Sequence, residues 1–282
     1  MNGITYSHEH MVIDLSKIKG NQDCYLNVYE EALNELRDLK DKGVCRIVDC
    51  SNRGMGVDWD INKRISEETG IEIVNSTGFY KDPFLPQYVH TSDVEVLEEI
   101  MLNDIKNGAK IIGEIGTSKD KITPDEKKVF LAACKAQRKT NTVIITHTTL
   151  GTMALEQIHL FEENNVNLKK IIISHAALKN DFNLIEKIVQ RGANVAFDTI
   201  GKLAYLSDDT TAEFIKRLID SGYSGQLLLS MDLTRKSHLK KNGGNGYAYL
   251  VDTFVPLLLS KGIKEEAIEK IMCKNFTEIL EA

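Results

Sequence analysis

Two histidines near the start of the chain, His8 and His10, have the spacing of metal ligands. A short run of β-forming residues, 3–8, leads into them. Side chains two residues apart point to the same face of an extended backbone, so both imidazoles can converge beside the end of that strand. Because a divalent ion usually takes at least three protein ligands, the pair predicts a metal site only if later segments supply the others.

Later ligand-type side chains stand at the ends of apolar runs that are typical of buried strands. They are Glu114, His147, His175 and Asp232. Each one alone has an ordinary structural explanation, such as a hydrogen-bonding histidine or a solvated carboxylate. Together with the first pair they mark five strand ends, in the order His-x-His, carboxylate, His, His, Asp. That joint pattern favours one shared site.

The elements that must position these residues alternate short β-rich runs with longer helical patterns. Runs such as Ile171-Ile172-Ile173 are continuously apolar, as parallel strands covered on both faces are. The expected strands are 3–8, 45–50, 72–77, 110–116, 142–147, 170–175, 193–198 and 226–232. The expected helices are 28–42, 60–69, 93–107, one that starts at the capping residue Thr123, 151–164, 180–191, 211–221, 246–261 and one from Lys264 to near the end.

This alternation predicts an α/β fold, a TIM (β/α)8 barrel in which each of eight strands is followed by a helix. Glycines just after several of the expected helices support the assignment. A doubly wound open sheet has the same alternation, but eight units and a shared rim of ligands favour closure. The chain has no linker or shift in composition, so we expect one domain that spans residues 1–282.

Barrel active sites lie at the carboxyl ends of the strands, where all the candidate ligands stand. Six ligands at one rim suit two divalent metal ions, which would share a solvent hydroxide because bound metal lowers the pKa of water to roughly 7. We expect Zn²⁺, with Mn²⁺, Co²⁺ or Ni²⁺ as alternatives that the same ligands suit. The expected division is His8, His10 and Asp232 on one ion, His147 and His175 on the other, and Glu114 as the bridge between them.

Composition excludes several kinds of partner. A net charge of −6 with both signs interspersed argues against nucleic-acid or anionic-membrane binding. No apolar run approaches the roughly 18 residues of a membrane span, and the first strand leaves no room for a signal peptide. The five cysteines form no C-x-x-C pair and are expected to be free thiols in a reducing cytoplasm. We therefore expect a cytoplasmic protein with a small-molecule substrate, and leave the oligomeric state, a homodimer included, open.

The ligand order and four longer segments resemble the phosphotriesterase family of the amidohydrolase superfamily, over essentially the whole chain. The segments are 113–118, 146–148, 197–202 and 229–239. The likeness is strongest to the bacterial branch called phosphotriesterase homology proteins. The resemblance implies a metal-dependent hydrolase in which Asp232 accepts a proton from the attacking water and returns it to the leaving group.

One departure from the family pattern concerns the bridge. Many phosphotriesterases bridge their metals with a lysine carbamylated by carbon dioxide, whereas the aligned residue here is Glu114. Glutamate already carries a carboxylate on a shorter stem, so assembly is expected to need no carbon dioxide. The departure argues against a direct transfer of phosphotriesterase activity. Family members also hydrolyse lactones, some of them phosphorylated.

Substrate selection is expected in the loops after the seventh and eighth strands. The loop 234–249 is basic and glycine-rich, so Arg235 and Lys236, together with Lys202, predict an anion-binding surface. A solvated flexible loop is the alternative. Tyr80 is expected at the mouth of the site, although core packing explains it equally well.

Three functions remain open at this point. The first is a dinuclear hydrolase of a lactone, carboxylic ester or phosphoester, with an anionic group on the substrate. The second is hydrolysis of an amide or ring amide on the same metals. The third is a metal-binding barrel without efficient catalysis, against which the presence of Asp232 counts.

Overall fold

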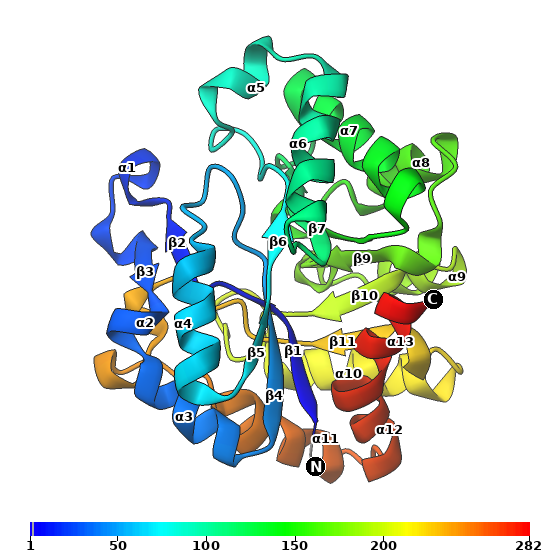
Figure 1. Ribbon diagram of the computed structural model, residues 1–282. Coiled ribbons are helices and arrows are strands. Elements are labelled where there is room, and N and C mark those ends of the chain that lie inside the picture. The colour runs from blue at the N-terminus through cyan, green and yellow to red at the C-terminus, as the bar shows by residue number, and fades with distance from the viewer. Residues whose placement is uncertain (2) are drawn as a thin grey trace.

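All the predicted strands are present and form the wall of a barrel (Figure 1). The computed structural model describes every residue of the chain except Asn2. The predicted strand 72–77 is split at Asn75 into two pieces that occupy one barrel position. The wall consists of β1 (Ile4–Glu9), β4 (Val44–Asp49), β5 (Glu72–Val74) with β6 (Ser76–Thr77), β7 (Ile111–Thr117), β8 (Val143–Thr148), β9 (Ile171–Ser174), β10 (Asn194–Phe197) and β11 (Leu227–Leu229).

The hydrogen-bonding order of the strands determines which strand ends are neighbours. β1, β4 and β5 form one parallel ladder, and β6 to β11 form another in chain order. β5 and β6 connect the two ladders because they are parts of one strand. The ring closes between β11 and β1, where Ser7 Oγ donates to the Leu229 carbonyl (3.1 Å) and the His8 N–H donates to Ser230 Oγ (3.1 Å). The predicted TIM barrel is confirmed.

Helices follow the strands around the outside of the barrel (Figure 1). The capping box predicted at Thr123 is confirmed, since its hydroxyl accepts from the Glu126 N–H while the Glu126 carboxylate accepts from the Thr123 N–H. The single helix predicted over 28–42 is wrong, because Ala32 at φ −140° divides it. The helices are α2 (Val28–Glu31), α3 (Leu33–Asp41), α4 (Trp59–Thr69), α6 (Val94–Lys106), α7 (Pro124–Thr140), α8 (Ala154–Glu163), α9 (Phe182–Gln190), α10 (Asp208–Asp220), α11 (Val255–Ser260), α12 (Glu265–Glu269) and α13 (Asn275–Glu281).

A small insertion between β1 and α2 has no counterpart in the sequence expectations. It contains the antiparallel pair β2 (Val12–Asp14) and β3 (Tyr25–Asn27), with the four-residue helix α1 (Ser16–Lys19) between them. A short helix α5 (Gln87–Thr91) after β6 is also unpredicted. These elements are too short to show a hydrophobic period. They matter because the insertion forms part of the wall above the barrel mouth.

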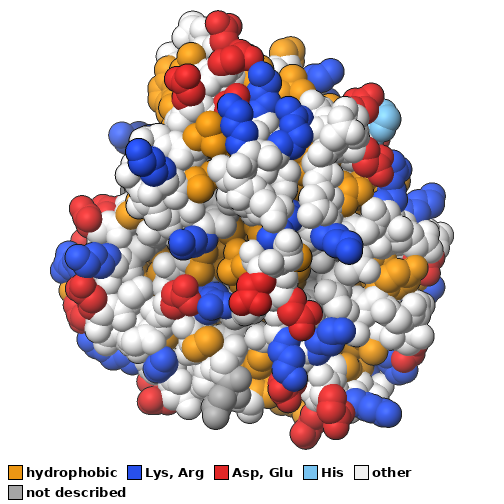
Figure 2. Space-filling model, turned by 45° about the vertical axis from the view of Figure 1, so that its right-hand side comes forward, with side chains coloured by type: hydrophobic (Ala, Val, Ile, Leu, Met, Phe, Trp, Pro, Cys, Tyr) orange, Lys and Arg blue, Asp and Glu red, His pale blue; other side chains and the backbone are white. Residues whose placement is uncertain are grey.

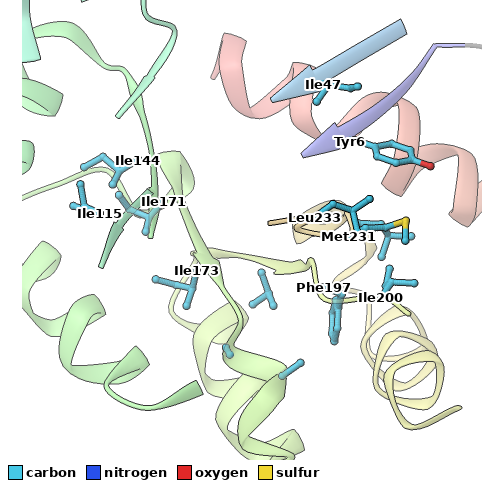
Figure 3. Packing of buried hydrophobic residues seen from close by; sticks show 14 of the residues in the cluster. Tyr6, Ile47, Ile115, Ile144, Ile171, Ile173, Phe197, Ile200, Met231 and Leu233 are labelled. Atoms are coloured by element: carbon cyan, nitrogen blue, oxygen red, sulfur yellow. The ribbon is translucent and has the colours of Figure 1, made fainter. Parts of the chain in front are cut away.

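Neighbouring residues of each strand fill different layers of the core, which explains the continuous apolar runs. Ile145 and Ile172 belong to a cluster that draws residues from most strands of the ring and therefore lies inside the barrel. Ile144, Ile171 and Ile173 belong to the larger cluster that packs between strands and helices (Figure 3). Both faces of the strands are thus buried, as a closed parallel barrel requires.

The surface agrees with the balanced composition. Side chains of both charges are scattered over the face shown in Figure 2, with small hydrophobic patches between them. All five cysteines are free thiols. Among the helices that the structure describes, none combines the length and the apolar character that crossing a bilayer demands.

Candidate metal centre

The structure brings all six predicted ligands to the carboxyl end of the barrel. His8 lies in β1 and His10 directly after it, so the two rings lie on the same side with centroids 5.6 Å apart. The other four come from β7, β8 and the residues after β9 and β11: Glu114, His147, His175 and Asp232. His175 and Asp232 adopt the left-handed region, at φ 62° and 50°, a backbone strain of about 1–3 kcal/mol that the surrounding structure must hold in place.

The Glu114 carboxylate occupies the centre of the cluster. Its Oε1 lies 3.5 Å from His10 Nε2, while its Oε2 lies 3.4 Å from His8 Nε2, 3.2 Å from His147 Nδ1 and 3.4 Å from His175 Nε2. Asp232 Oδ1 lies 3.2 Å from His10 Nε2. One carboxylate oxygen of Glu114 therefore faces His10 and the other faces His8, His147 and His175, so both oxygens are directed at imidazoles, as a bridging ligand requires.

Two nitrogen atoms at the centre have no hydrogen-bond partner. The Nε2 atoms of His8 and His10 are buried, and neither forms a hydrogen bond with any residue that the structure describes. A buried polar atom without a partner is costly, so these two nitrogen atoms are suited to binding a metal ion. Two sets of side chains have ligand atoms within 4.8 Å of one another: His8, Glu114 and His175, and His8, His10 and Asp232. Imidazole and carboxylate donors at this spacing fit divalent metal ions.

Asp198, which was not among the predicted site residues, orients two of the histidines from behind. Its Oδ1 accepts a hydrogen bond from His175 Nδ1 (2.8 Å), and its Oδ2 lies 3.3 Å from His8 Nδ1. The hydrogen-bond partner of His8 Nδ1 is Ser174 Oγ (3.0 Å). Because a carboxylate only accepts, Asp198 beside both Nδ1 atoms favours the tautomers protonated there, with both Nε2 atoms directed inward. A carboxylate directly after the seventh strand was the sequence signal for this role.

The remaining imidazoles are held by hydroxyl groups. Ser51 Oγ lies 3.0 Å from His10 Nδ1, and Thr149 Oγ1 lies 3.1 Å from His147 Nε2. Thr149 in turn donates to the Thr117 carbonyl (2.7 Å). His147 thus presents Nδ1 to the centre, whereas the other three histidines present Nε2. Burial lowers the pKa of His147 to about 4, so its ring is neutral and its lone pair is available.

Glu9 anchors the loop that carries Asp232. It lies between the two N-terminal histidines in sequence, but its fully buried side chain points to the other face of β1. Its carboxylate accepts from Ser230 Oγ (2.7 Å) and from the N–H groups of Met231 (2.7 Å), Asp232 (3.2 Å) and Leu233 (2.9 Å). Nothing in the sequence pattern distinguishes Glu9 from a solvated residue between two ligands.

Both carboxylates of the centre remain ionised. Burial alone would raise the pKa of Glu114, but the surrounding imidazoles, His8 foremost, hold it well below its usual range. Burial also acts to raise the pKa of Asp232, and the Lys202 ammonium together with His10 and His175 lowers it far below its usual range. Lys202 forms an ion pair with Asp232 Oδ2, so Oδ1 is the oxygen that faces the histidines.

A cavity of about 640 Å³ opens directly above the cluster, a suitable size for a small-molecule substrate. Of the predicted substrate-binding residues, Tyr80, Lys202 and Arg235 line it. The Tyr80 hydroxyl lies 3.3 Å from His147 Nδ1, so the residue is part of the site wall. Lys236 is not among the lining residues: it pairs with Glu31 (3.1 Å) because its side chain turns toward α2.

The fold and the metal-binding cluster define this protein as a metal-dependent hydrolase of the TIM-barrel type, a class that the comparisons support. A sequence model of the phosphotriesterase family matches residues 1–280. The chain therefore belongs to the phosphotriesterase family.

Individual relatives show where the chain stands within the family. It is 41% identical over 280 residues to the phosphotriesterase homology protein of Escherichia coli (strain K12), covering 97% of this chain and 96% of the relative. The crystal structure of that protein, with phosphate in its active site, matches with a TM-score of 0.96 at 40% identity and covers 99% of each chain.

Two other similar proteins have different stated activities. The structure of a lactonase from Listeria monocytogenes matches with a TM-score of 0.94 at 28% identity, covering 99% of this chain and 94% of that chain. An N-acetyltaurine hydrolase of Bos taurus is 30% identical over 275 residues, which cover 90% of this chain and 78% of the relative. Both stated activities are hydrolyses, and they differ in the substrate.

Proposed function

We propose that this protein is a dinuclear metal-dependent hydrolase that acts on an ester-type bond of a small molecule. His8, His10 and Asp232 would hold one ion, and His147 and His175 the other, with Glu114 between them. The observation that carries this assignment is the position of Glu114, whose Oε1 faces His10 (3.5 Å) and whose Oε2 faces His147 (3.2 Å). His8 Nε2 lies 3.4 Å from Oε2 and belongs to both sets of ligand atoms, and its spacing of two from His10 assigns it to the first ion. Zn²⁺ is the metal we expect, because mixed imidazole and carboxylate ligands suit it well.

When bound, two such ions supply an activated water nucleophile and polarise the carbonyl or phosphoryl oxygen that is attacked. Residues of the chain supply the proton transfer and shape the site. Asp232 Oδ1 lies at the centre of the site and accepts the proton of the attacking water, which it returns to the leaving group. Lys202 holds Oδ2 of Asp232 in an ion pair, so Oδ1 is the oxygen that accepts the proton. The Tyr80 ring contacts His147 edge-on and shields this side of the site from water.

We propose a lactone, a carboxylic ester or a phosphoester as the scissile group, on a substrate that carries an anionic group. The lactonase activity stated for one structural neighbour supports the first choice. Arg235 lines the cavity, and its nearest carboxylate, Asp23, lies 3.9 Å away, so its guanidinium remains available to an oxyanion. Arg235→Ala should raise KM about tenfold for an anionic substrate and much less for a neutral one. Equal effects on both substrates would contradict this role.

An amide is the second candidate bond, since one relative is an N-acetyltaurine hydrolase. The same metals and the same proton acceptor can serve an amide, because the attack on a carbonyl carbon is alike in both reactions. A metal-binding barrel without efficient catalysis is the third reading. The ion pair that holds Asp232 in place favours a working proton acceptor and so counts against it.

The test combines metal analysis with a substrate screen. Protein reconstituted with Zn²⁺ should contain two ions per chain and should hydrolyse members of a panel of lactones, aryl esters, aryl phosphoesters and acyl amides. Asp232→Asn should lower kcat by at least about a thousandfold, because proton transfer and one metal ligand are both affected. The matched control Asp220→Asn removes the same charge from an exposed pair with Lys216 and should change nothing. Two ions without turnover of any ester, lactone or amide would favour the non-catalytic reading.

A further inference from the structure

Two lysines on the cavity wall beyond β6 are not used by the proposed chemistry. Lys19, at the end of α1, and Lys81, just after β6, both line the cavity above the metal centre. Their ammonium groups lie over the same aromatic ring, with Lys19 Nζ 5.8 Å and Lys81 Nζ 5.6 Å from the centroid of Phe84. Lys81 also lies 5.5 Å from the Tyr80 centroid. Elements far apart in sequence thus bring two cations to one place.

Lys81 is held at this place by the barrel itself. The Tyr80 carbonyl accepts a hydrogen bond from the Gly116 N–H (2.8 Å), so the pairing of the third and fourth barrel strands continues past β6 to the rim. The stem of Lys81 packs against Gly116, where an added Cβ would lie only 3.2 Å from Lys81 Cβ and Cδ. Such a contact leaves no space between them. The stem of Lys81 therefore lies against the strand that carries Glu114.

These lysines have no close ion-pair partner among the residues that the structure describes, although the carboxylates of Glu126, Glu114 and Asp82 act on the Lys81 charge from a longer distance. Lys81 Nζ donates to the Asp82 carbonyl (2.9 Å), and neither ammonium is ion-paired with a carboxylate among the residues that the structure describes. An ammonium has three donors, so Lys81 keeps two for a ligand. Burial lowers the pKa of this half-buried lysine, and an anion at the site would offset that cost. By contrast, Lys202 is bound to Asp232 and Lys236 to Glu31.

Lys19 and Lys81 lie on a different side of the cavity from Lys202. β6 belongs to the third barrel strand and Lys202 follows the seventh, so the two lie four strands apart in a ring of eight. Lys81 is also next to the strands of Glu114 and His147, which places it on the side of the centre where His147 lies.

We propose that Lys81 and Lys19 form an oxyanion subsite that binds a phosphate or carboxylate group carried on an apolar stem of the substrate. The two ammonium groups bind the oxyanion, and the rings of Phe84 and Tyr80 pack against the stem. The identification of this group as part of the substrate rests on the proposed function, whereas the binding of an oxyanion does not.

The experiment measures binding directly, by isothermal titration calorimetry on the metal-loaded protein. The probes are butylphosphonate and pentanoate as anions, with pentanamide as the neutral match. Lys81→Met should raise the Kd of the anions about tenfold, because it removes a charge-assisted hydrogen bond. Lys19→Met should raise it about threefold, since Lys19 is exposed. Lys17→Met, on the same helix but outside the cavity wall, is the matched control and should leave the Kd within about twofold.

A rescue variant separates charge from packing. Lys81→Arg restores a cation and should bring the Kd within about threefold of the native value, with melting temperature and metal content unchanged in all variants. A larger effect on butylphosphonate identifies a phosphate group, and a larger effect on pentanoate identifies a carboxylate. If Kd responds but no ester, lactone or amide is hydrolysed, the subsite stands and the proposed function fails. If Lys81→Met and Lys19→Met bind both anions as the Lys17→Met control does, the subsite proposal is overturned.

Discussion

The role of Asp198 makes the sharpest prediction about how the centre is assembled. Asp198→Asn preserves the shape of the side chain but replaces one acceptor by an amide donor. Asp198 Oδ1 accepts from both the side chain and the backbone N–H of His175, whereas Oδ2 lies 3.3 Å from His8 Nδ1, which also has Ser174 Oγ at 3.0 Å. The amide oxygen of asparagine will therefore stay with His175, and its NH₂ group will face His8. That donor favours the His8 tautomer with the proton on Nε2, which is the atom directed to the metal.

The magnitude follows from these two contacts. A hydrogen bond to a charged group contributes about 1.5–3 kcal/mol, and loss of an outer partner of a ligating histidine typically weakens metal binding about 10–100-fold. His8 loses the neighbouring carboxylate but keeps Ser174 Oγ (3.0 Å), so the ion bound by His8 and His10 should bind about 10–100-fold more weakly. His175 keeps a hydrogen bond but loses the charge, so the other ion should bind about tenfold more weakly.

Competition with a chelator provides the assay. Zn²⁺ is titrated away from the native protein, from Asp198→Asn and from Ser51→Ala, and the two dissociation steps are resolved by metal analysis. Ser51 contacts His10 Nδ1 through a neutral hydroxyl, so its loss should cost no more than about tenfold at one ion. If Asp198→Asn retains both ions with native affinity, the reasoning about the orientation of His8 and His175 is refuted.

Three further predictions follow from other parts of the structure. Glu9→Gln leaves the N–H of Met231 or of Leu233 without its acceptor. A denaturant titration should therefore show a free energy of unfolding lower by about 3 kcal/mol, and kcat should fall because Asp232 is displaced. Unchanged values for both quantities would show that Glu9 is not needed as an anchor. Thr123→Ala removes one half of the capping box of α7. It should lower the free energy of unfolding by about 1 kcal/mol and leave kcat unchanged. A large loss of activity would contradict this purely structural role. Because Glu114 already supplies a carboxylate, reconstitution with Zn²⁺ should proceed equally fast with and without bicarbonate, and a dependence on bicarbonate would point to a carbamylated residue.

The barrel and its central ligands could be predicted because they depend on short-range patterns. Continuous apolar runs such as Ile171-Ile172-Ile173 reflect burial on both faces of a barrel strand, and the observed clusters show this directly. The carboxyl ends of parallel strands meet at one rim, so ligand-type residues at five such ends had to converge. The spacing of two between His8 and His10 needed only the geometry of an extended strand.

The contacts around that centre depend on long-range geometry that no local pattern encodes. Glu9 and the loop at Met231 lie more than two hundred residues apart, and only the closure of β1 against β11 brings them together. The insertion that carries Lys19 consists of strands of three residues, too short for any period to show. Lys236 shows that a long-range contact can also remove an expected function. Its position in the sequence suited anion binding, but an ion pair with Glu31 of α2 neutralises its charge. The residue type predicts which chemistry a side chain can perform, and its contacts in the folded structure determine whether the side chain is free to perform it.

The most direct test of the account is an anomalous difference map from a crystal of the Zn²⁺-loaded protein, recorded at the zinc edge. The account predicts two peaks, one beside His8, His10 and Asp232 and the other beside His147 and His175, with Glu114 in contact with both. A single peak, or peaks that leave Glu114 without a metal contact, would contradict the dinuclear centre.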